Sequence, residues 1–184
     1  MKCPKCQTVE LKAERLDGFL PVQHCPNCGG NWLMLEDYLR HKHEVPAASP
    51  SLANAALEAE ETEKALLCPM TGALMTKFRI SKDTAHRLDL STRVNGIWLD
   101  KGEWELLKAH GLAGRLNTLF TDFWQRQVRE AQADDRLDEM YRSLLGEDDY
   151  EKLKELRNWL KQHPQRERMR AFLLAEGPAS SLNS

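Results

Sequence analysis

Four of the five cysteines in this 184-residue chain form two closely spaced pairs. The first pair is Cys3 and Cys6, and the second pair is Cys25 and Cys28. Two C-x2-C pairs separated by roughly 15–20 residues have the spacing of a zinc site, because each tight turn directs two thiolates toward one point. Protein sulfur fills all four positions, so no position remains for water or a substrate. The sequence therefore predicts one structural Zn²⁺ per chain.

Two alternatives for these cysteines are disulfide bonds and a thioredoxin-like redox motif. Disulfides form in oxidising compartments, and no apolar segment typical of a signal peptide follows Met1. A redox motif has a single C-x-x-C near a βαβ pattern rather than two pairs that flank a hairpin. The metal site is therefore favoured, and the cytoplasm is the expected location.

The residues between the two pairs predict a hairpin that brings the pairs together. Residues 9–16 and 19–24 have the composition of two short strands, and Asp17-Gly18 between them is a strong hairpin-turn signal. Farther along the chain, Asp100 and Glu103 have the spacing of a capping box, and Gly111 is suited to end a helix. We therefore expect helices at residues 36–43 and 100–110.

The chain also contains an internal repeat of this pattern. Gly96-Ile97-Trp98-Leu99 matches Gly30-Asn31-Trp32-Leu33, which lies 66 residues earlier. Cys68-Pro69-Met70-Thr71 matches Cys3-Pro4-Lys5-Cys6, which lies 65 residues earlier. Self-similarity of this kind predicts two related structural units in one chain.

The second repeat lacks three of the four metal ligands. The positions that match Cys6, Cys25 and Cys28 hold Thr71, Ser91 and Val94. A single thiolate at Cys68 cannot hold zinc with these neighbours. We therefore expect a metal-free ribbon held together by the packing of its apolar strand residues.

Both segments resemble the bacterial zinc-finger family named after the zinc ribbon of transcription factor IIB. Its members read C-P-x-C, a hairpin, then C-P-x-C-G-G-x-W-L-D-x-G-E-L and a helix. Residues 3–43 keep the metal half but carry Met34 in place of the Asp, whereas residues 68–110 keep Gly96–Glu103 and lose the metal half. The resemblance implies a zinc-ribbon fold and transcription-related or nucleic-acid binding, although a shared fold does not by itself fix a function.

The sequence as a whole predicts a small α+β protein with an all-α C-terminal region. From residue 112 on, apolar residues recur at helical spacing, which favours a bundle whose stripes form its own core; the alternative is a stripe that stays exposed and pairs with another chain. The predicted segments are a zinc ribbon at 1–45, a linker and connecting helix at 46–67, a metal-free ribbon-like repeat at 68–111, a helical bundle at 112–176 and a disordered tail at 177–184.

The sequence argues against an enzyme and against a membrane protein. It contains no G-x-S-x-G, phosphate-binding loop, H-E-x-x-H or Gly-rich dinucleotide turn. It also contains no apolar run approaching the roughly 18 residues of a spanning helix. We therefore expect a non-catalytic protein without a membrane partner.

Nucleic-acid binding can be weighed against the distribution of charge. The net charge of −2 gives no overall attraction to phosphate. Residues 68–110 are the most basic segment, with seven Lys and Arg against five Asp and Glu. A typical nucleic-acid site uses about 6–10 phosphate contacts, so this segment offers few. The candidate contacts lie on one hairpin: Lys77, Arg79, Lys82, Arg87 and Arg93.

The favoured function is therefore a macromolecular-interaction adaptor whose partner is another protein. Zinc ribbons are stiff platforms that can accept a partner strand or loop. Trp32 and Trp98 are candidate anchors if they are exposed and residues of the fold if they are buried. Nucleic-acid binding is the alternative, and a zinc or redox sensor that unfolds on thiolate oxidation is a third hypothesis. The sequence leaves the oligomeric state open.

Overall fold

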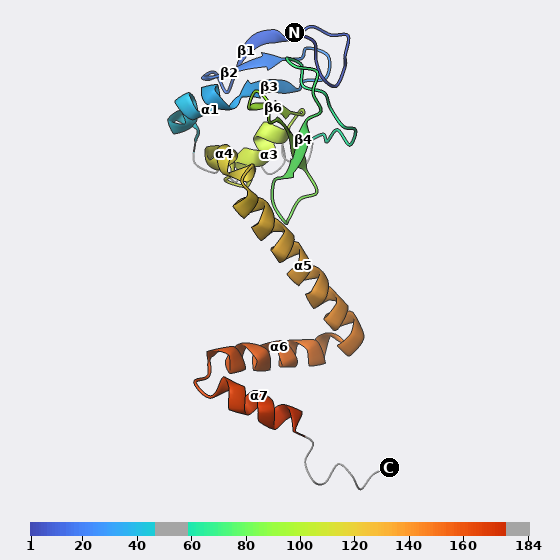
Figure 1. Cartoon of the computed structure of the whole chain (residues 1–184), viewed down its shortest axis with the longest axis vertical. Helices are drawn as coiled ribbons and strands as arrows, with labels where there is room; N and C mark the ends of the chain where they lie inside the picture. The colour runs from blue at the N-terminus through green and yellow to red at the C-terminus, as the bar shows by residue number, and fades with distance from the viewer. Residues whose placement is uncertain (47–58, 176–184) are drawn as a thin grey trace. The chain divides into compact units, whose positions relative to one another are not determined.

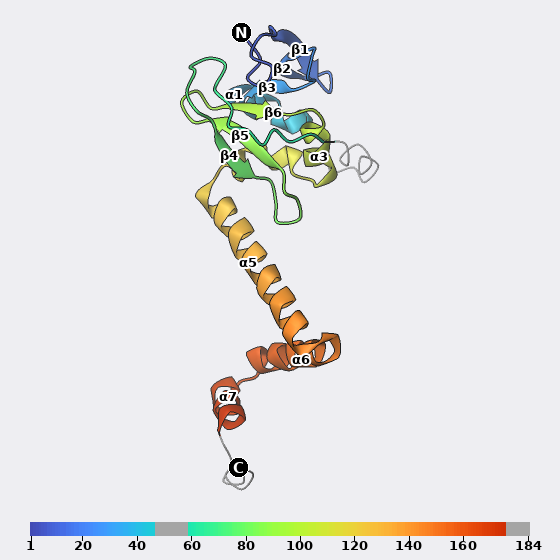
Figure 2. The ribbon, with the colours of Figure 1, turned by 90° about the vertical axis from the view of Figure 1, so that its right-hand side faces the viewer.

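The computed structural model describes residues 1–46 and 59–175, and its first half is built on one six-stranded antiparallel sheet (Figure 1). The strands are β1 (Lys12–Leu16), β2 (Leu20–His24), β3 (Asn31–Met34), β4 (Thr76–Arg79), β5 (Arg87–Ser91) and β6 (Gly96–Leu99). Their order across the sheet is β1-β2-β3-β6-β5-β4, so each half of the sheet is a run of three strands (Figure 2). The predicted turn at Asp17-Gly18 joins β1 to β2, and both of its residues have positive φ, of 53° and 81°.

The two halves of the sheet join where β3 pairs with β6. In this register Trp32 lies opposite Trp98, and Leu33 lies opposite Ile97. Each indole ring covers a glycine of the other half: a Cβ added to Gly30 would lie 2.2 Å from Cζ2 of Trp98. A Cβ added to Gly96 would lie 2.0 Å from Cζ2 of Trp32. No other residue type fits at either glycine without displacing a ring.

Trp32 and Trp98 are buried, with exposed fractions of 2% and 0%. They pack in one apolar cluster with Cys3, Cys25 and Cys68, whereas the helices that follow them pack in a different cluster. The two indoles are therefore residues of the fold and are not available as exposed anchors for a partner.

The helices that pack on the sheet cover the face opposite the indole rings, because successive side chains of a strand point to opposite faces. These elements are α1 (Leu35–His41), α3 (Glu103–Ala109), α4 (Leu116–Leu119) and two 3₁₀ turns, η1 (Lys42–Glu44) and η3 (Ala113–Arg115). Figure 1 shows α1, α3 and α4 grouped on one side of the strands. Their buried side chains form the main core with the strand residues Leu33, Ile97 and Leu99.

Polar contacts also connect the helices of one half to the other half. Asp17, in the first hairpin turn, accepts hydrogen bonds from Trp104 Nε1 at 2.7 Å and from Lys108 Nζ at 2.8 Å. Tyr38 of α1 donates its hydroxyl to the carbonyl of Ala113 at 2.8 Å and accepts the amide of Leu116 at 3.1 Å. The two halves of the sheet, with the helices that follow them, therefore fold as one unit.

Residues 59–67 differ from the prediction of a connecting helix. This segment, which we call the strap, is not helical. The amide of Glu60 donates to the carbonyl of Lys101 at 2.9 Å, and the amide of Thr62 donates to Asp100 Oδ2 at 2.6 Å. These fixed acceptors hold the strap against the sheet and override its helical composition. The rest of the predicted linker and helix, and the predicted tail, fall at residues 47–58 and 176–184, outside the described residues.

The chain divides into two compact units, Met1–Gln132 and the residues from Ala133 on, and the boundary falls within α5. The elements are α5 (Asp122–Leu145), α6 (Glu147–Gln162) and α7 (Arg166–Leu174). The sequence predicts one bundle over 112–176, whereas Leu112, Leu116 and Leu119 pack in the core of the first unit. None of the helices in the described ranges combines the length and the apolar character of a membrane span.

Replacement of either covered glycine tests the junction of the two halves. We expect Gly96→Ala and Gly30→Ala each to lower the free energy of unfolding by about 3 kcal/mol, because the new methyl group displaces a buried indole. Urea denaturation of the zinc-loaded protein, followed by tryptophan fluorescence, measures this. Gly114→Ala is the control, since a Cβ there meets nothing within 4 Å. A loss at Gly96 no larger than at Gly114 would contradict the proposed packing.

Candidate metal centre

The four cysteines predicted as metal ligands converge at one point of the first unit. The Sγ atoms of Cys3, Cys6, Cys25 and Cys28 all lie within 4.8 Å of one another. Cys3 and Cys6 come from the turn before β1, and the other two come from the turn between β2 and β3. The β1–β2 hairpin brings the two turns together, as the sequence predicts.

The spacing of the sulfurs fits a tetrahedral zinc ion. The Sγ atoms of Cys3 and Cys28 lie 3.7 Å apart, and those of Cys6 and Cys25 lie 3.9 Å apart. A tetrahedral ion with Zn–S bonds of about 2.3 Å places its ligands about 3.8 Å apart. Both distances exceed the S–S bond length of about 2.05 Å, so the thiols are free. The four-cysteine cluster can therefore hold one zinc ion, which confirms the predicted cofactor.

The electrostatics of the cluster also favour a bound cation. Burial raises the pKa of the Cys3 thiol far above its usual range and raises that of Cys28 to about 11. Burial also opposes ionisation of Cys25, but backbone hydrogen bonds from Cys28 and Asn27 lower its pKa to about 7. Cys25 therefore ionises more readily than an ordinary thiol, whereas positive charge between the sulfurs would favour ionisation of Cys3 and Cys28.

Hydrogen bonds around the sulfurs orient them toward this point. The amide of Cys6 donates to Cys3 Sγ at 3.3 Å, and Asn27 Nδ2 donates to Cys6 Sγ at 3.3 Å. The side chain of Lys5 extends from the same turn to the second half of the sheet, where its Nζ lies 2.8 Å from Glu60 and 3.5 Å from Asp100. Bonds to thiolates stabilise the charged form, so Asn27 supports the metal centre without binding the ion, whereas Lys5 connects the same turn to Glu60 and Asp100.

A second turn with the same backbone arrangement surrounds Cys68. The amide of Gly72 donates to the carbonyl of Cys68 at 2.8 Å, as the amide of Gln7 does to the carbonyl of Cys3. Gly72 and Gln7 both have positive φ, of 69° and 63°. We call the metal-binding turn at residues 3–7 the first knuckle and the turn at residues 68–72 the second knuckle. The second knuckle therefore repeats the backbone shape of the first, at the position where the sequence predicts a turn without metal.

Two of the three positions that correspond to the other zinc ligands, Thr71 and Ser91, hold hydroxyl groups, and the third holds Val94. Burial opposes ionisation of Cys68, but hydrogen bonding from the side chains of Ser91 and Thr71 lowers its pKa. In the described parts of the chain, Cys68 belongs to no group of three or more residues arranged to bind a metal.

The five candidate nucleic-acid contacts do not form one continuous track. Lys77 donates to Asp89 at 2.8 Å and to the carbonyl of Thr62 at 2.6 Å, and Arg87 donates to Glu61 at 2.9 Å. Lys77 and Arg87 are therefore neutralised within the fold, and Lys82 Nζ lies 4.0 Å from Asp83 Oδ1.

The remaining three cations are distributed over both ends of the hairpin. Arg79 lies opposite Arg87 on the β4–β5 ladder and is half-buried. Lys82 precedes β5 and Arg93 follows it, so these two residues lie beyond opposite ends of that strand. The candidate cations are therefore dispersed, and Lys77, Lys82 and Arg87 each lie beside a carboxylate.

Several residues that lie around the metal-binding turn were not among the predicted site residues. Asn27 and Lys5 lie beside the cysteines in the sequence, so their positions could have suggested a role. Asp100, Glu60 and Thr62 had no such signal, because they approach the first knuckle only through the fold.

Comparison with known proteins finds one family model that matches the N-terminal segment. Residues 2–44 match the family model described as the transcription factor zinc-finger, a zinc ribbon of the transcription factor IIB type. No curated protein and no solved structure matches the chain. The match confirms the expected zinc ribbon over these residues and does not extend to the second half of the sheet.

Removal of one ligand tests the structural role of the metal. We expect Cys25→Ser to lose zinc and to unfold the β1–β3 region, since structural zinc contributes roughly 10 kcal/mol or more to the folding of small ribbons. Because β3 pairs with β6, protease sensitivity should extend into residues 68–110, while helical circular dichroism from α6 and α7 remains. Zinc analysis and limited proteolysis provide the measurements.

Cys68→Ser is the matched control for this experiment, because Cys68 is a buried cysteine outside the four-sulfur cluster. It should retain one zinc per chain. Full zinc occupancy in Cys25→Ser would show that the ion does not require all four thiolates.

Proposed function

We propose that this chain is a non-catalytic zinc-ribbon protein that binds another protein, and that its zinc is structural. The observation that supports this most directly is the exposure of apolar side chains on the C-terminal helices. Among the described residues of the second unit, only Tyr150 and Leu160 are buried apolar residues. The large apolar side chains that stay exposed there are Leu137, Met140, Tyr141, Leu144, Leu145, Leu153, Leu156, Trp159, Phe172, Leu173 and Leu174.

Five of these residues form a continuous stripe along α5. On α5, Leu137, Met140, Tyr141, Leu144 and Leu145 occur at the i, i+3, i+4, i+7 and i+8 positions of one helix face. Each is between 42% and 71% exposed. Contiguous apolar surface of this kind is rare on monomeric proteins and is typical of protein interfaces. A helical unit this small also has little core of its own, so a partner would contribute to its stability.

The alternative function is nucleic-acid binding, which the description of the matching family favours. The ion pairs of Lys77 and Arg87 with Asp89 and Glu61 weaken this alternative, because paired cations bind phosphate less well. Fluorescence anisotropy with labelled DNA and RNA distinguishes the two functions. Micromolar binding with a log–log salt slope of about −4 would replace the protein-binding proposal.

We further propose that residues 68–110 are a second ribbon, related to the first, that folds without metal. The match of the knuckle at Cys68, the pairing of Trp32 with Trp98 and the similar order of strands support this proposal. Hydrogen bonds between Cys68, Thr71 and Ser91 take the place of metal bonds in this arrangement.

Reversal of the apolar stripe tests the protein-binding function. We expect Leu137→Glu/Leu144→Glu to reduce co-purification of bound protein at least about tenfold, because hot-spot contacts cost 2 kcal/mol or more when lost. Circular dichroism should stay unchanged, since both residues are exposed. The control, Arg136→Glu/Ser143→Glu, introduces the same two residues beside the stripe. Equal recovery of partners by both variants would contradict the proposal.

Restoration of the missing ligands tests the metal-free repeat. The protein as it exists should bind one zinc per chain, whereas Thr71→Cys/Ser91→Cys/Val94→Cys should bind two, because the knuckle backbone is already in place. Titration with zinc and elemental analysis give the stoichiometry. A second equivalent bound by the unaltered protein would show that the second ribbon carries metal after all.

A further inference from the structure

Two titratable side chains in the second half of the first unit face each other at the start of α3. Glu103, the first residue of this helix, is only 1% exposed, and His86 directly precedes β5. Glu103 Oε2 accepts the amide of Asp100 at 2.7 Å, whereas Oε1 is buried and forms no hydrogen bond with a described residue. His86 Nδ1 lies 3.9 Å from Oε1 and is also buried without a hydrogen bond. Buried polar atoms without partners are costly, so these two atoms are positioned to share a proton.

The charges around this pair leave Glu103 dependent on a proton. The surrounding charged groups come from the strap, the first knuckle, β4, β5 and the turn before α3: Glu60, Glu61, Lys5, Lys77, Arg87, Asp89 and Asp100. Lys77 pairs with Asp89, and Arg87 pairs with Glu61. Lys5 is shared between Glu60 and Asp100. Among these groups no cation is left for Glu103, so its charge is offset by protonation of His86 or removed by its own protonation.

Both members of the pair hold a proton more tightly in the folded protein. Burial raises the pKa of Glu103 from its ordinary value of 4.5 to about 7, although His86 opposes the rise. Interaction with the Glu103 carboxylate raises the pKa of His86, although burial opposes the rise. A group with a raised pKa contributes stability that is fully present below its ordinary pKa and is lost as pH rises through the raised value. Stability at this position is therefore lost as pH rises to neutral and above.

Asp100 connects the pair to the strap. Its backbone amide donates to Glu103, and its Oδ2 accepts the amide of Thr62 at 2.6 Å. Asp100 is itself only 3% exposed, so negative charges on Asp100 and Glu103 repel each other with little screening by water. The protonation state of the pair therefore acts on the residue that holds the start of the strap.

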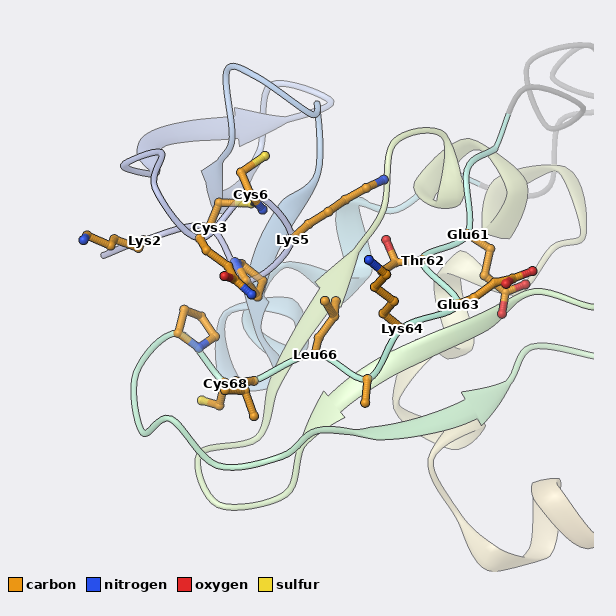
Figure 3. A pocket seen from close by; sticks show the side chains of 15 residues that line it. Lys2, Cys3, Lys5, Cys6, Glu61, Thr62, Glu63, Lys64, Leu66 and Cys68 are labelled. Atoms are coloured by element: carbon orange, nitrogen blue, oxygen red, sulfur yellow. Dashed lines mark hydrogen bonds between the residues drawn. The ribbon is translucent and has the colours of Figure 1, made fainter.

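The strap forms one wall of a cleft of about 1070 Å³ (Figure 3). Residues 61–69 line this wall, and residues 2–7, which include the ligands Cys3 and Cys6, line the other. Figure 3 shows Glu61 and Thr62 on the strap and Lys5 on the first knuckle. Lys5 Nζ lies 2.8 Å from Glu60, so the start of the strap is also the place where the two walls are connected. A change in the position of residues 60–62 therefore changes the width of the cleft.

We propose that His86 and Glu103 form a proton-controlled latch that holds the start of the strap against the sheet. With a proton on the pair, the charge of Glu103 is compensated and Asp100 keeps its bond to the amide of Thr62. When the proton passes to solvent, two buried carboxylates lie close together without a cation for Glu103, and the bond to Thr62 opens. The cleft then widens. The inference goes beyond the proposed protein-binding function and does not depend on it.

Amide hydrogen exchange of Thr62 in the full-length, zinc-loaded protein tests the latch. NMR follows the exchange between about pH 6 and 8.5, corrected for the intrinsic pH dependence of amide exchange. Protection of this amide should fall at least about tenfold over the range, because a group with a folded-state pKa of about 7 changes the opening equilibrium by that factor. The amide of Leu112, which donates to the carbonyl of Leu107 at 2.8 Å, is the internal control. Constant protection of Thr62, or an equal fall at Leu112, would overturn the proposal.

Two variants separate the roles of the pair. Glu103→Gln keeps an acceptor for the amide of Asp100 but cannot ionise, so the change in Thr62 protection should shrink to less than about twofold. His86→Gln removes the positive charge that favours the Glu103 carboxylate, so the fall should move to higher pH.

His43→Gln is the matched control for these variants, since His43 is an exposed histidine 4.0 Å from Glu44, and it should leave the profile unchanged. If Glu103→Gln does not fold, the direction of the shift in His86→Gln decides. A natural profile in either latch variant, or the same shift in His43→Gln, contradicts the latch.

Discussion

The pairing of β3 with β6 is the constraint on which the first unit depends. Each indole of the Trp32–Trp98 pair fills the space that a glycine of the opposite half leaves open, so neither half can bury its own tryptophan. A three-stranded half alone would expose a large ring and an unpaired strand edge. The interface is isologous, as in a two-fold symmetric dimer, but both partners belong to one chain.

The pairing of β3 with β6 allows two halves of the sheet with different sources of stability to share one core. The first half has four thiols that can hold one zinc ion, which supplies much of the folding energy of small ribbons, whereas the second half has one thiol with hydroxyl neighbours. Because β3 and β6 are the central strands of the sheet, the metal stabilises its own half and, through the shared ladder, the other half as well. Asp17 and Tyr38 reinforce this coupling through hydrogen bonds that connect the two halves.

The sequence predicts best those features that depend on neighbours in the chain. The four cysteines, the Asp17-Gly18 turn and the helix from Glu103 follow from local spacing, and the structure contains all three. The strap was mispredicted because its fixed position depends on Asp100, more than thirty residues away in the sequence. For the same reason, the sequence could not show that Lys77 and Arg87 are neutralised by carboxylates within the fold.

The distribution of charge and apolar surface explains why a protein is the more suitable partner. The cations of the β4–β5 hairpin are partly used by the fold, whereas most large apolar side chains in the described part of the second unit stay exposed. Exposed leucines cost free energy in water, and each one buried in a complex returns about 1.5–3 kcal/mol. Residues 2–44 resemble a zinc ribbon of transcription factors. In the function that we propose, the exposed apolar surface would select a partner by shape and apolar contact rather than by phosphate charge.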